Sequence, residues 1–352
     1  GYEWPFDCRK VIGGSSIIDL LVYRERVLLG RRVFLDFRSN PYGMTDLPYD
    51  GLREEARDYL KNAGACFGTP IERLLHMNAP AVDLYKSKGV DITKEMLEIA
   101  LCAQHNNGGL DIDMWWQTNV PHLFAAGEVA GSHGVYRPGG SALNAGQVGS
   151  MRAAQYIAEY GAGDALSDAE FEAAAADTLA YHRTLAAAML TGEDTVTAAM
   201  RRATERMTEN GGAIRNPAKI EAALAETKAD FAAFADTVRV SGTGQLRLAY
   251  RLRDVLIAQQ MYLSAMLDYA AHGGKSRGSS LYSAAEGECP AGFDDSFRFA
   301  LDDGALDASV QLLSFDGGAC VPAWRGVRPL PEGGGFFENV WREYRENHHN
   351  VY

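Results

Sequence analysis

The 352-residue chain has few cysteines and no long apolar segment. Its cysteines show no CxxC pair and no cysteine–histidine spacing, which argues against a zinc site, an iron–sulfur cluster or another metal centre. No apolar run approaches the roughly 20 residues that span a bilayer, so we expect no membrane span. Scattered free thiols are typical of a reducing compartment and favour a cytoplasmic location. The five cysteines are Cys8, Cys66, Cys102, Cys289 and Cys320.

Basic residues are also in short supply. The chain carries 34 Lys and Arg against 46 Asp and Glu, a formal net charge of -12, and has no Lys/Arg run of five or more. A surface with this surplus repels phosphate backbones, so we expect no nucleic-acid partner. Hydrophobic residues make up 47% and charged residues 23%, as in globular proteins with large cores.

Hydrophobic periodicity divides the chain into segments that differ in predicted secondary structure. In the first part it predicts helices over 17–29, 50–62 and 69–88 and a strand over 33–37. The stretch 100–160 is different, because short apolar segments alternate there with turns and glycines. We expect strands over 110–113 and 120–127, then a glycine-rich loop, and then a helix of small residues.

The remainder of the chain is predicted to be mostly helical. An antiparallel bundle is expected from 168–190, 194–209, 216–239 and 247–271. A loop over 273–293, strands within 296–314 and a terminal helix follow.

The glycine-rich stretch 104–144 holds the candidate site. Gly108 and Gly109 permit a close approach of the backbone to a neighbour or ligand. Gly127 and Glu128 end an apolar segment with a carboxylate, the position from which doubly wound folds bind ribose or ribityl hydroxyls. Ser141 opens a helix, whose first N–H groups favour negative charge.

Two ionisable residues, His133 and Arg137, lie inside this loop. An arginine among glycines can bind a carboxylate through two parallel hydrogen bonds. A structural loop with a solvated arginine explains the same residues equally well, so both interpretations stay open at this point.

Three motifs in order, GGLDID, VPHLFAAGEVAG and HGVYRPGGSALNAG, resemble the flavoprotein family of fumarate reductase and succinate dehydrogenase, which also includes aspartate oxidase. GRRVFLDFRSNP resembles a strand of that family's capping domain, and AHGGKSRGSSLY resembles the loop that closes its helical bundle. The resemblance covers about residues 14–285.

The resemblance implies FAD as cofactor and a small carboxylate as substrate. Its implied catalytic group is Arg137, with Gln104 and His105 before the double glycine. For the cofactor it implies Glu128 on a sugar hydroxyl and the backbone at Gly108, Gly109, Gly127, Ser141, Ala142 and Leu143 beside the flavin. For the substrate it implies Arg137, His133 and Arg277, although an ion pair between domains is an equal alternative for Arg277.

The chain departs from the family pattern at two catalytic positions. Gln104 stands where fumarate-type members have a substrate-binding histidine, and His105 follows it. The helix expected from 17 opens with Gly13-Gly14-Ser15-Ser16, where those members carry a proton-delivering arginine. Gln104 can still hydrogen-bond a substrate but carries no charge, and His105 could replace the histidine only after a local backbone shift. The missing arginine speaks against fumarate itself as the substrate.

A third departure concerns the fold. No GxGxxG follows a predicted strand, so we expect a C-terminal fragment that lacks the N-terminal dinucleotide-binding unit. The expected class is α+β: a partial capping domain, the C-terminal part of an FAD-binding α/β domain and a helical bundle. The expected divisions are 1–100 for the partial capping domain, 101–162 for the FAD-binding segment, 163–290 for the bundle and 291–352 for an extension.

The sequence thus predicts part of an FAD-dependent oxidoreductase that transfers hydride between flavin and a carboxylate-bearing substrate. Amino-acid oxidation as in aspartate oxidase, and a non-catalytic module for subunit contacts, are the alternatives. An electron-transfer partner protein and an oligomer are compatible with either oxidoreductase. We expect the isolated chain to be inactive and to stay colourless, without bound flavin.

Overall fold

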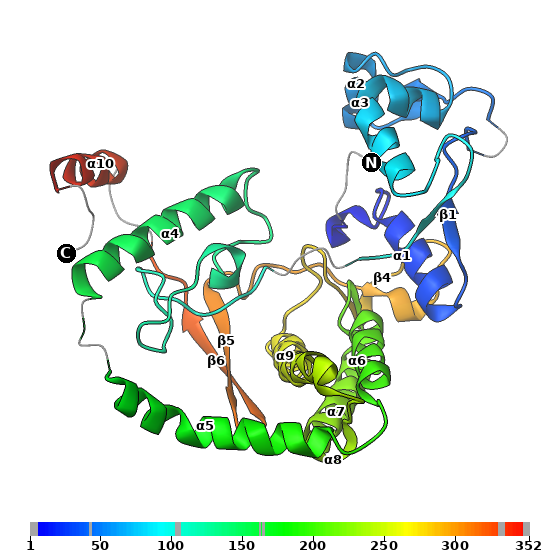
Figure 1. Cartoon of the computed structure of the whole chain (residues 1–352). Helices are drawn as coiled ribbons and strands as arrows, with labels where there is room; N and C mark the ends of the chain where they lie inside the picture. The colour runs from blue at the N-terminus through cyan, green and yellow to red at the C-terminus, as the bar shows by residue number, and fades with distance from the viewer. Residues whose placement is uncertain are drawn as a thin grey trace. The chain divides into compact units, whose positions relative to one another are not determined.

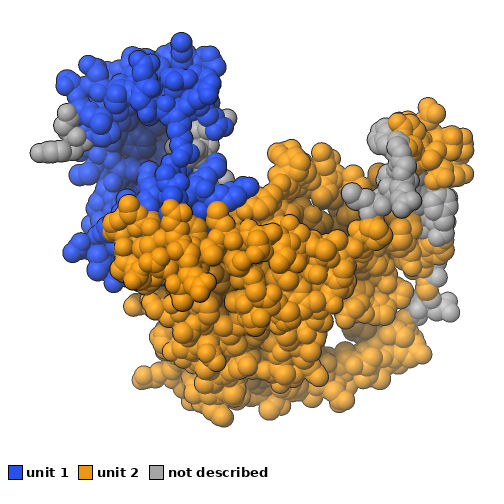
Figure 2. Space-filling model, turned by 180° about the vertical axis from the view of Figure 1, so that it is seen from behind, with its two compact units in different colours: residues 1–102 blue, residues 103–352 orange. Residues whose placement is uncertain are grey.

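The computed structural model describes residues 6–41, 44–102, 107–161, 163, 166–329 and 335–347. The chain divides into two compact units, residues 1–102 and residues 103–352 (Figures 1 and 2). Each unit combines helices with short strands, which confirms the predicted α+β class.

The first unit contains the helices predicted near its start. Helix α1 (Ile17–Tyr23) continues as a π-helical turn over Arg24–Leu28, and Leu20 of α1 is fully buried. Strand β1 (Val33–Leu35) confirms the predicted strand and pairs antiparallel with β2 (Leu97–Ile99), a strand that the periodicity did not indicate.

Two further helices complete the first unit. Helix α2 (Glu54–Asn62) and helix α3 (Pro70–Ser87) confirm the predicted segments. Thr69 and Glu72 form a capping box at the start of α3, which fixes the helix N-terminus. The chain kinks at Asn78, because Pro80 cannot continue the hydrogen-bond ladder inside a helix.

The predicted strands over 110–113 and 120–127 are wrong. In this part of the described chain only an isolated bridge joins Gln117 to Phe124. The Asp113 carboxylate accepts hydrogen bonds from the backbone N–H groups of Trp115 (2.7 Å) and Gln117 (3.0 Å), and Trp116 has a positive φ of 65°. A second turn follows, in which the Val120 N–H donates to Thr118 Oγ1 (3.1 Å) and the Leu123 N–H to the Val120 carbonyl oxygen (3.1 Å), so these backbone groups are satisfied locally and not by a neighbouring strand.

The second unit then forms the predicted helix of small residues. A 3-10 turn over Gly127–Ala130 precedes helix α4 (Ser141–Tyr160), which begins after Gly140. Gly140 has φ +79°, a left-handed conformation that glycine adopts without steric cost. The predicted helix opening at Ser141 is confirmed.

The predicted helical bundle is confirmed. Its core gathers around α9, which packs against α6 and α7, and Met189, Val196 and Leu252 are nearly inaccessible to solvent. Burial of such apolar side chains is the main stabilising contribution in this part of the chain. The helices are α5 (Asp168–Met189), α6 (Val196–Asn210), α7 (Pro217–Ala232), α8 (Phe234–Thr237) and α9 (Leu246–Ala271).

The C-terminal segments differ in part from the expectations. Strand β4 (Leu281–Glu288) pairs in parallel with β3 (Ile214–Arg215), so the predicted loop over 273–293 is wrong for these residues. Pairing with a strand 67 residues earlier is a tertiary contact that local periodicity does not contain. The structure forms no regular strand over 297–303, where it shows isolated bridges at Phe299.

The strand predicted around 309–314 and the terminal helix are present. Strand β5 (Ser309–Asp316) forms an antiparallel hairpin with β6 (Ala319–Gly326), a strand that was not predicted, and α10 (Phe336–Asn347) is the terminal helix. Short 3-10 turns also occur at Cys8–Lys10, Tyr49–Gly51, Thr243–Gln245 and Asp295–Phe297.

A first prediction concerns the N-terminus of α7. The Asn216 side chain accepts a hydrogen bond from the Lys219 N–H (3.2 Å), and Pro217 occupies the first helical position. Asn216→Ala should lower the free energy of unfolding of the bundle by about 1 kcal/mol, because a backbone donor loses its acceptor. Urea denaturation followed by circular dichroism measures this difference. Asn216→Ser keeps a capping oxygen, so an equal loss in that variant would contradict the capping role.

Candidate functional site

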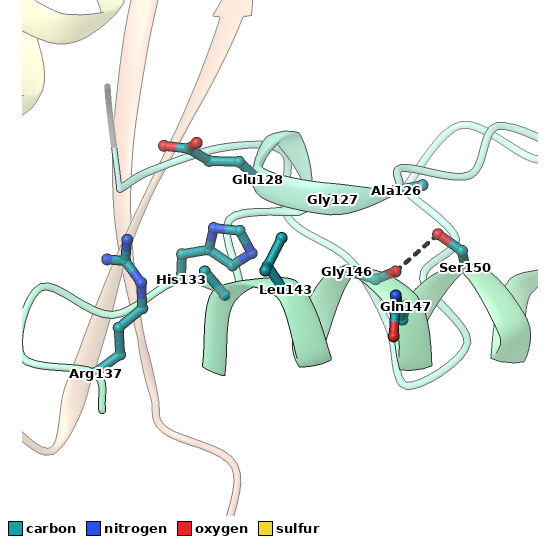
Figure 3. A pocket seen from close by; sticks show the side chains of 10 residues that line it. Ala126, Gly127, Glu128, His133, Arg137, Leu143, Gly146, Gln147 and Ser150 are labelled. Atoms are coloured by element: carbon teal, nitrogen blue, oxygen red, sulfur yellow. Dashed lines mark hydrogen bonds between the residues drawn. The ribbon is translucent and has the colours of Figure 1, made fainter. Parts of the chain in front are cut away.

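An open hollow of about 840 Å³ lies beside the start of α4 (Figure 3). Its wall combines the 3-10 turn at Gly127, the glycine-rich loop and one face of α4. The lining residues are Ala126, Gly127, Glu128, His133, Arg137, Ala142, Leu143, Gly146, Gln147 and Ser150.

Glu128 brings an acceptor to this hollow. Its Oε1 atom is buried and has no hydrogen-bond partner among the residues that the structure describes. The turn that carries Glu128 begins at Gly127, whose φ of +77° sets the direction of the chain at this point. A buried carboxylate oxygen without a donor is costly, so the position suits a ligand that offers hydroxyl groups.

His133 is the second buried polar group of the wall. Its side chain lies between Arg137 and Leu143 in Figure 3, the residue is 7% exposed, and its Nε2 atom has no partner in the described part of the chain. The ring nitrogen can donate or accept according to its tautomer. His133 can therefore bind a polar ligand atom in either role.

Arg137 supplies positive charge. Its Nη1 atom donates to Asn107 Oδ1 (2.8 Å) and to the Gly134 carbonyl oxygen (2.8 Å). These two bonds fix the plane of the guanidinium, and Figure 3 shows it on the same side of α4 as His133. A planar, oriented guanidinium is the group that proteins use to bind carboxylates.

The N-terminus of α4 adds a partial positive charge. The N-cap residue, Gly140, has no side chain that could cap the helix, and the Ser141 hydroxyl donates to the Pro138 carbonyl oxygen (2.7 Å). The backbone at Ala142 and Leu143 belongs to the first turn, which lines the hollow. Uncapped N–H groups and the helix dipole favour a negatively charged ligand atom there.

The double glycine packs against the backbone of the site. A Cβ atom on Gly109 would lie 2.3 Å from the Val129 carbonyl oxygen and 2.4 Å from the Gly131 nitrogen. The neighbouring Leu110 N–H donates to the same carbonyl oxygen (2.7 Å). Gly109 is therefore required for packing beneath the turn that carries Glu128. The expected approach of Gly108 and Gly109 to the flavin stays a prediction.

Six of the expected site residues line one hollow, namely Gly127, Glu128, His133, Arg137, Ala142 and Leu143, whereas Gly108, Gly109, Ser141 and Arg277 are described but do not line it. Arg277 forms ion pairs with Asp307 and with Asp302 (3.0 Å), and its pKa is raised, mainly by its hydrogen bond with Asp307. Its role toward a substrate stays a prediction. Gln104 and His105 lie outside the described residues.

Sequence reasoning missed part of the wall, namely Gly146, Gln147 and Ser150. These residues follow Leu143 at intervals of three, four and seven positions, so they share its face of α4. The signal was present once α4 was known to begin at Ser141.

The tandem tryptophans pack on α4. The Arg152 guanidinium lies 4.4 Å from the Trp115 ring centre, and the Trp116 ring occupies the space that a Cβ on Gly149 would need. These contacts support packing as the role of both rings. Within the described ranges, no group of His, Cys, Asp and Glu could hold a metal ion, and no helix is long and apolar enough to cross a membrane.

Parts of the chain are similar in sequence to known flavoproteins. Residues 20–143, about a third of the chain, match the family model "FAD binding domain". A 66-residue stretch is 53% identical to a fumarate reductase (CoM/CoB) subunit of Methanothermobacter marburgensis, over 18% of this chain and 12% of that protein. An uncharacterized FAD-dependent oxidoreductase of Methanocaldococcus jannaschii is 48% identical over 61 residues, 17% of this chain and 11% of that protein.

Solved structures share the fold. A quinol-fumarate reductase with menaquinol molecules superposes with a TM-score of 0.59 and 18% identity, over 92% of this chain and 59% of that chain. A mutant of the E. coli quinol fumarate reductase gives a TM-score of 0.53 and 20% identity, over 86% and 56%. The similarity therefore spans less than two thirds of each relative's length.

Motif order, the family model, the similar sequences and the shared fold all agree. Residues 20–143 match the FAD-binding domain family, in which FAD is the cofactor, and the chain resembles flavoprotein subunits of fumarate reductase in part of its sequence and in its fold.

Proposed function

We propose that residues 103–352 supply a flavin- and substrate-facing wall of an FAD-dependent oxidoreductase that acts on a carboxylate-bearing substrate. The observation that carries this proposal is the convergence of Glu128, His133, Arg137 and the uncapped start of α4 on one hollow. FAD, when bound, supplies hydride transfer to or from a carbon beside the carboxylate.

The described residues fit this cofactor. Glu128 Oε1 is a buried acceptor without a partner in the described chain, and FAD carries sugar-chain hydroxyl groups that can donate to it. Gly127 and Gly140 both leave open space where a Cβ atom would stand, so the backbone there does not obstruct a flat ring. The N-terminus of α4 would stabilise negative charge that develops on the reduced ring.

Arg137 would orient the substrate. Two hydrogen bonds from its guanidinium to one carboxylate would hold the reacting carbon at a fixed place in the hollow. His133, buried beside it, would donate to or accept from a second polar atom of the substrate.

The lack of a cationic proton donor just before α1 favours a second candidate function. The residues before α1 are Gly13, Gly14, Ser15 and Ser16, so none of them can act as the cationic proton donor of fumarate-type relatives. Amino-acid oxidation of the aspartate oxidase kind needs no such donor and is the alternative reaction. Gln104 and His105 stay candidate catalytic residues of either reaction.

We also propose an electron-transfer partner protein, because the cysteine spacing offers no ligand set for a cluster in this chain. All five cysteines are free thiols, which supports a reducing, cytoplasmic location. A purely non-catalytic contact role is tested by the binding experiments that follow, and assembly into an oligomer stays a prediction.

Flavin titration tests the cofactor site. The sequence alone predicts a chain that binds no flavin, but the hollow formed by the described residues leads us to expect that added FAD binds saturably and weakly, with the protein colourless as purified. Glu128→Gln should weaken binding about tenfold, because a neutral acceptor makes a weaker hydrogen bond than a carboxylate. Quenching of flavin fluorescence gives both dissociation constants.

The matched control is Glu159→Gln, which removes the same charge from an exposed position of α4. It should leave FAD affinity unchanged. Absence of saturable binding, or an equal loss in the two variants, would remove Glu128 from the flavin site and leave the contact-module alternative.

A further inference from the structure

A turn of the helical bundle holds the glycine-rich loop beside Arg137. The Gly278 N–H donates to the Tyr136 hydroxyl (2.8 Å), across 142 residues of sequence. Gly278 is buried and has φ +55°, and its missing Cβ leaves room for the Val135 side chain. The contact is therefore specific to glycine at 278 and to a hydroxyl at 136.

Arg277 reinforces this contact. Its guanidinium carbon lies 5.5 Å from the centre of the Tyr136 ring, within range of a cation–π interaction. Its ion pairs with Asp302 and Asp307 hold the guanidinium in place and leave its planar face to the ring. Arg277, held by Asp302 and Asp307, therefore contacts the Tyr136 ring from a fixed position.

The turn itself is firmly anchored. Arg277 and Ser280 exchange backbone hydrogen bonds of 2.9 and 3.0 Å, and the Ser276 N–H donates to the Ala300 carbonyl oxygen (3.1 Å). The Ser276 side chain is buried, and its hydroxyl accepts from the Tyr282 N–H (2.9 Å). A turn fixed on several sides can serve as a rigid support for a loop that is otherwise rich in glycine.

We propose that Tyr136 and Arg277 are positioning residues, which fasten the loop at 133–137 to the turn at 276–280 and so aim the adjacent Arg137 guanidinium into the hollow. This inference rests on the proposed binding of a carboxylate by Arg137. Arg277 acts through Tyr136 and does not touch the substrate. If this contact were lost, the loop would be more mobile and carboxylate affinity would fall, because each binding event would have to order Arg137.

Hydrogen exchange and succinate titration of the 352-residue chain test the proposal. Tyr136→Phe keeps the ring but leaves the buried Gly278 N–H without its acceptor. We expect amide exchange over 133–137 to become about five- to tenfold faster and the succinate dissociation constant to rise by a similar factor. Arg277→Gln should have the same two effects, and Arg277→Lys smaller ones, since lysine keeps the charge but not the planar face.

Tyr181→Phe is the matched control. Tyr181 also has an arginine over its ring, Arg253 at 5.9 Å, but it lies on α5 and is 51% exposed. Neither loop exchange nor succinate affinity should change in this variant. Exchange over α9 should stay unchanged in every variant, which shows that the bundle is folded.

The outcomes separate the two proposals. Unchanged exchange over 133–137, or faster exchange with unaltered succinate affinity, overturns the positioning role. If the unaltered chain binds no succinate, the proposed carboxylate function falls and the aiming of Arg137 falls with it, while faster exchange would still demonstrate the fastening contact.

Discussion

Arg137→Ala is expected to weaken the binding of succinate by about a hundredfold. The guanidinium is held in the wall of the hollow by Asn107 and the Gly134 carbonyl oxygen, so it meets a carboxylate already oriented. Loss of a bidentate, charge-assisted pair from such a site removes most of the affinity for a small acid. Isothermal titration of the purified chain measures the change, and in a working oxidoreductase it would appear in KM.

Two further arginine variants sharpen this result. Arg137→Lys retains the positive charge but not the planar guanidinium, so it should weaken succinate binding about tenfold. Arg201→Ala removes an arginine whose side chain is 79% exposed on α6, so it should leave succinate affinity unchanged. An Arg137→Ala variant with the affinity of the unaltered chain would remove Arg137 from the substrate site.

Gly109→Ala should have the largest effect on stability. The added Cβ atom would overlap the Val129 carbonyl oxygen and the Gly131 nitrogen, and both are backbone atoms that cannot rotate away. We expect a loss of about 3 kcal/mol in the free energy of unfolding of this region. The displaced turn carries Glu128, so flavin affinity should fall as well. Chemical denaturation and FAD titration measure the two effects.

Gly242→Ala is the control for this substitution. Gly242 has an extended backbone and open space around its Cβ position, so alanine there should not lower stability. If Gly109→Ala were as stable as that control and bound FAD normally, the close packing of Gly109 beneath the Glu128 turn would be refuted.

Local sequence signals determined the helices of this protein. Apolar periodicity located α1, α2, α3 and the bundle, because one buried stripe on each helix repeats with the helical period. The capping residue Asn216 and the following proline marked a boundary through bonds that span only a few positions. Such interactions are readable from the sequence because both partners lie within one turn.

The glycine-rich segment was readable only in part. Motif order identified Glu128, His133, Arg137 and the start of α4 as one site, and the structure gathers them around the hollow. The strand predicted over 120–127 failed, because local turns satisfy its backbone groups: the Val120 N–H donates to Thr118 Oγ1 (3.1 Å) and the Leu123 N–H to the Val120 carbonyl oxygen (3.1 Å). The apolar composition of this stretch did not outweigh that local hydrogen bonding.

What surrounds the glycine-rich loop was decided by tertiary structure alone. The sequence could not show that Arg277 pairs with Asp302 and Asp307 or that Gly278 donates to Tyr136, since these partners are 25 to 142 residues apart. The sequence determined which residues carry charge and which backbone positions can bend sharply. The contact of the bundle turn with the loop was decided by tertiary structure, because only a folded chain brings an N–H and a hydroxyl that distant in sequence within hydrogen-bond range.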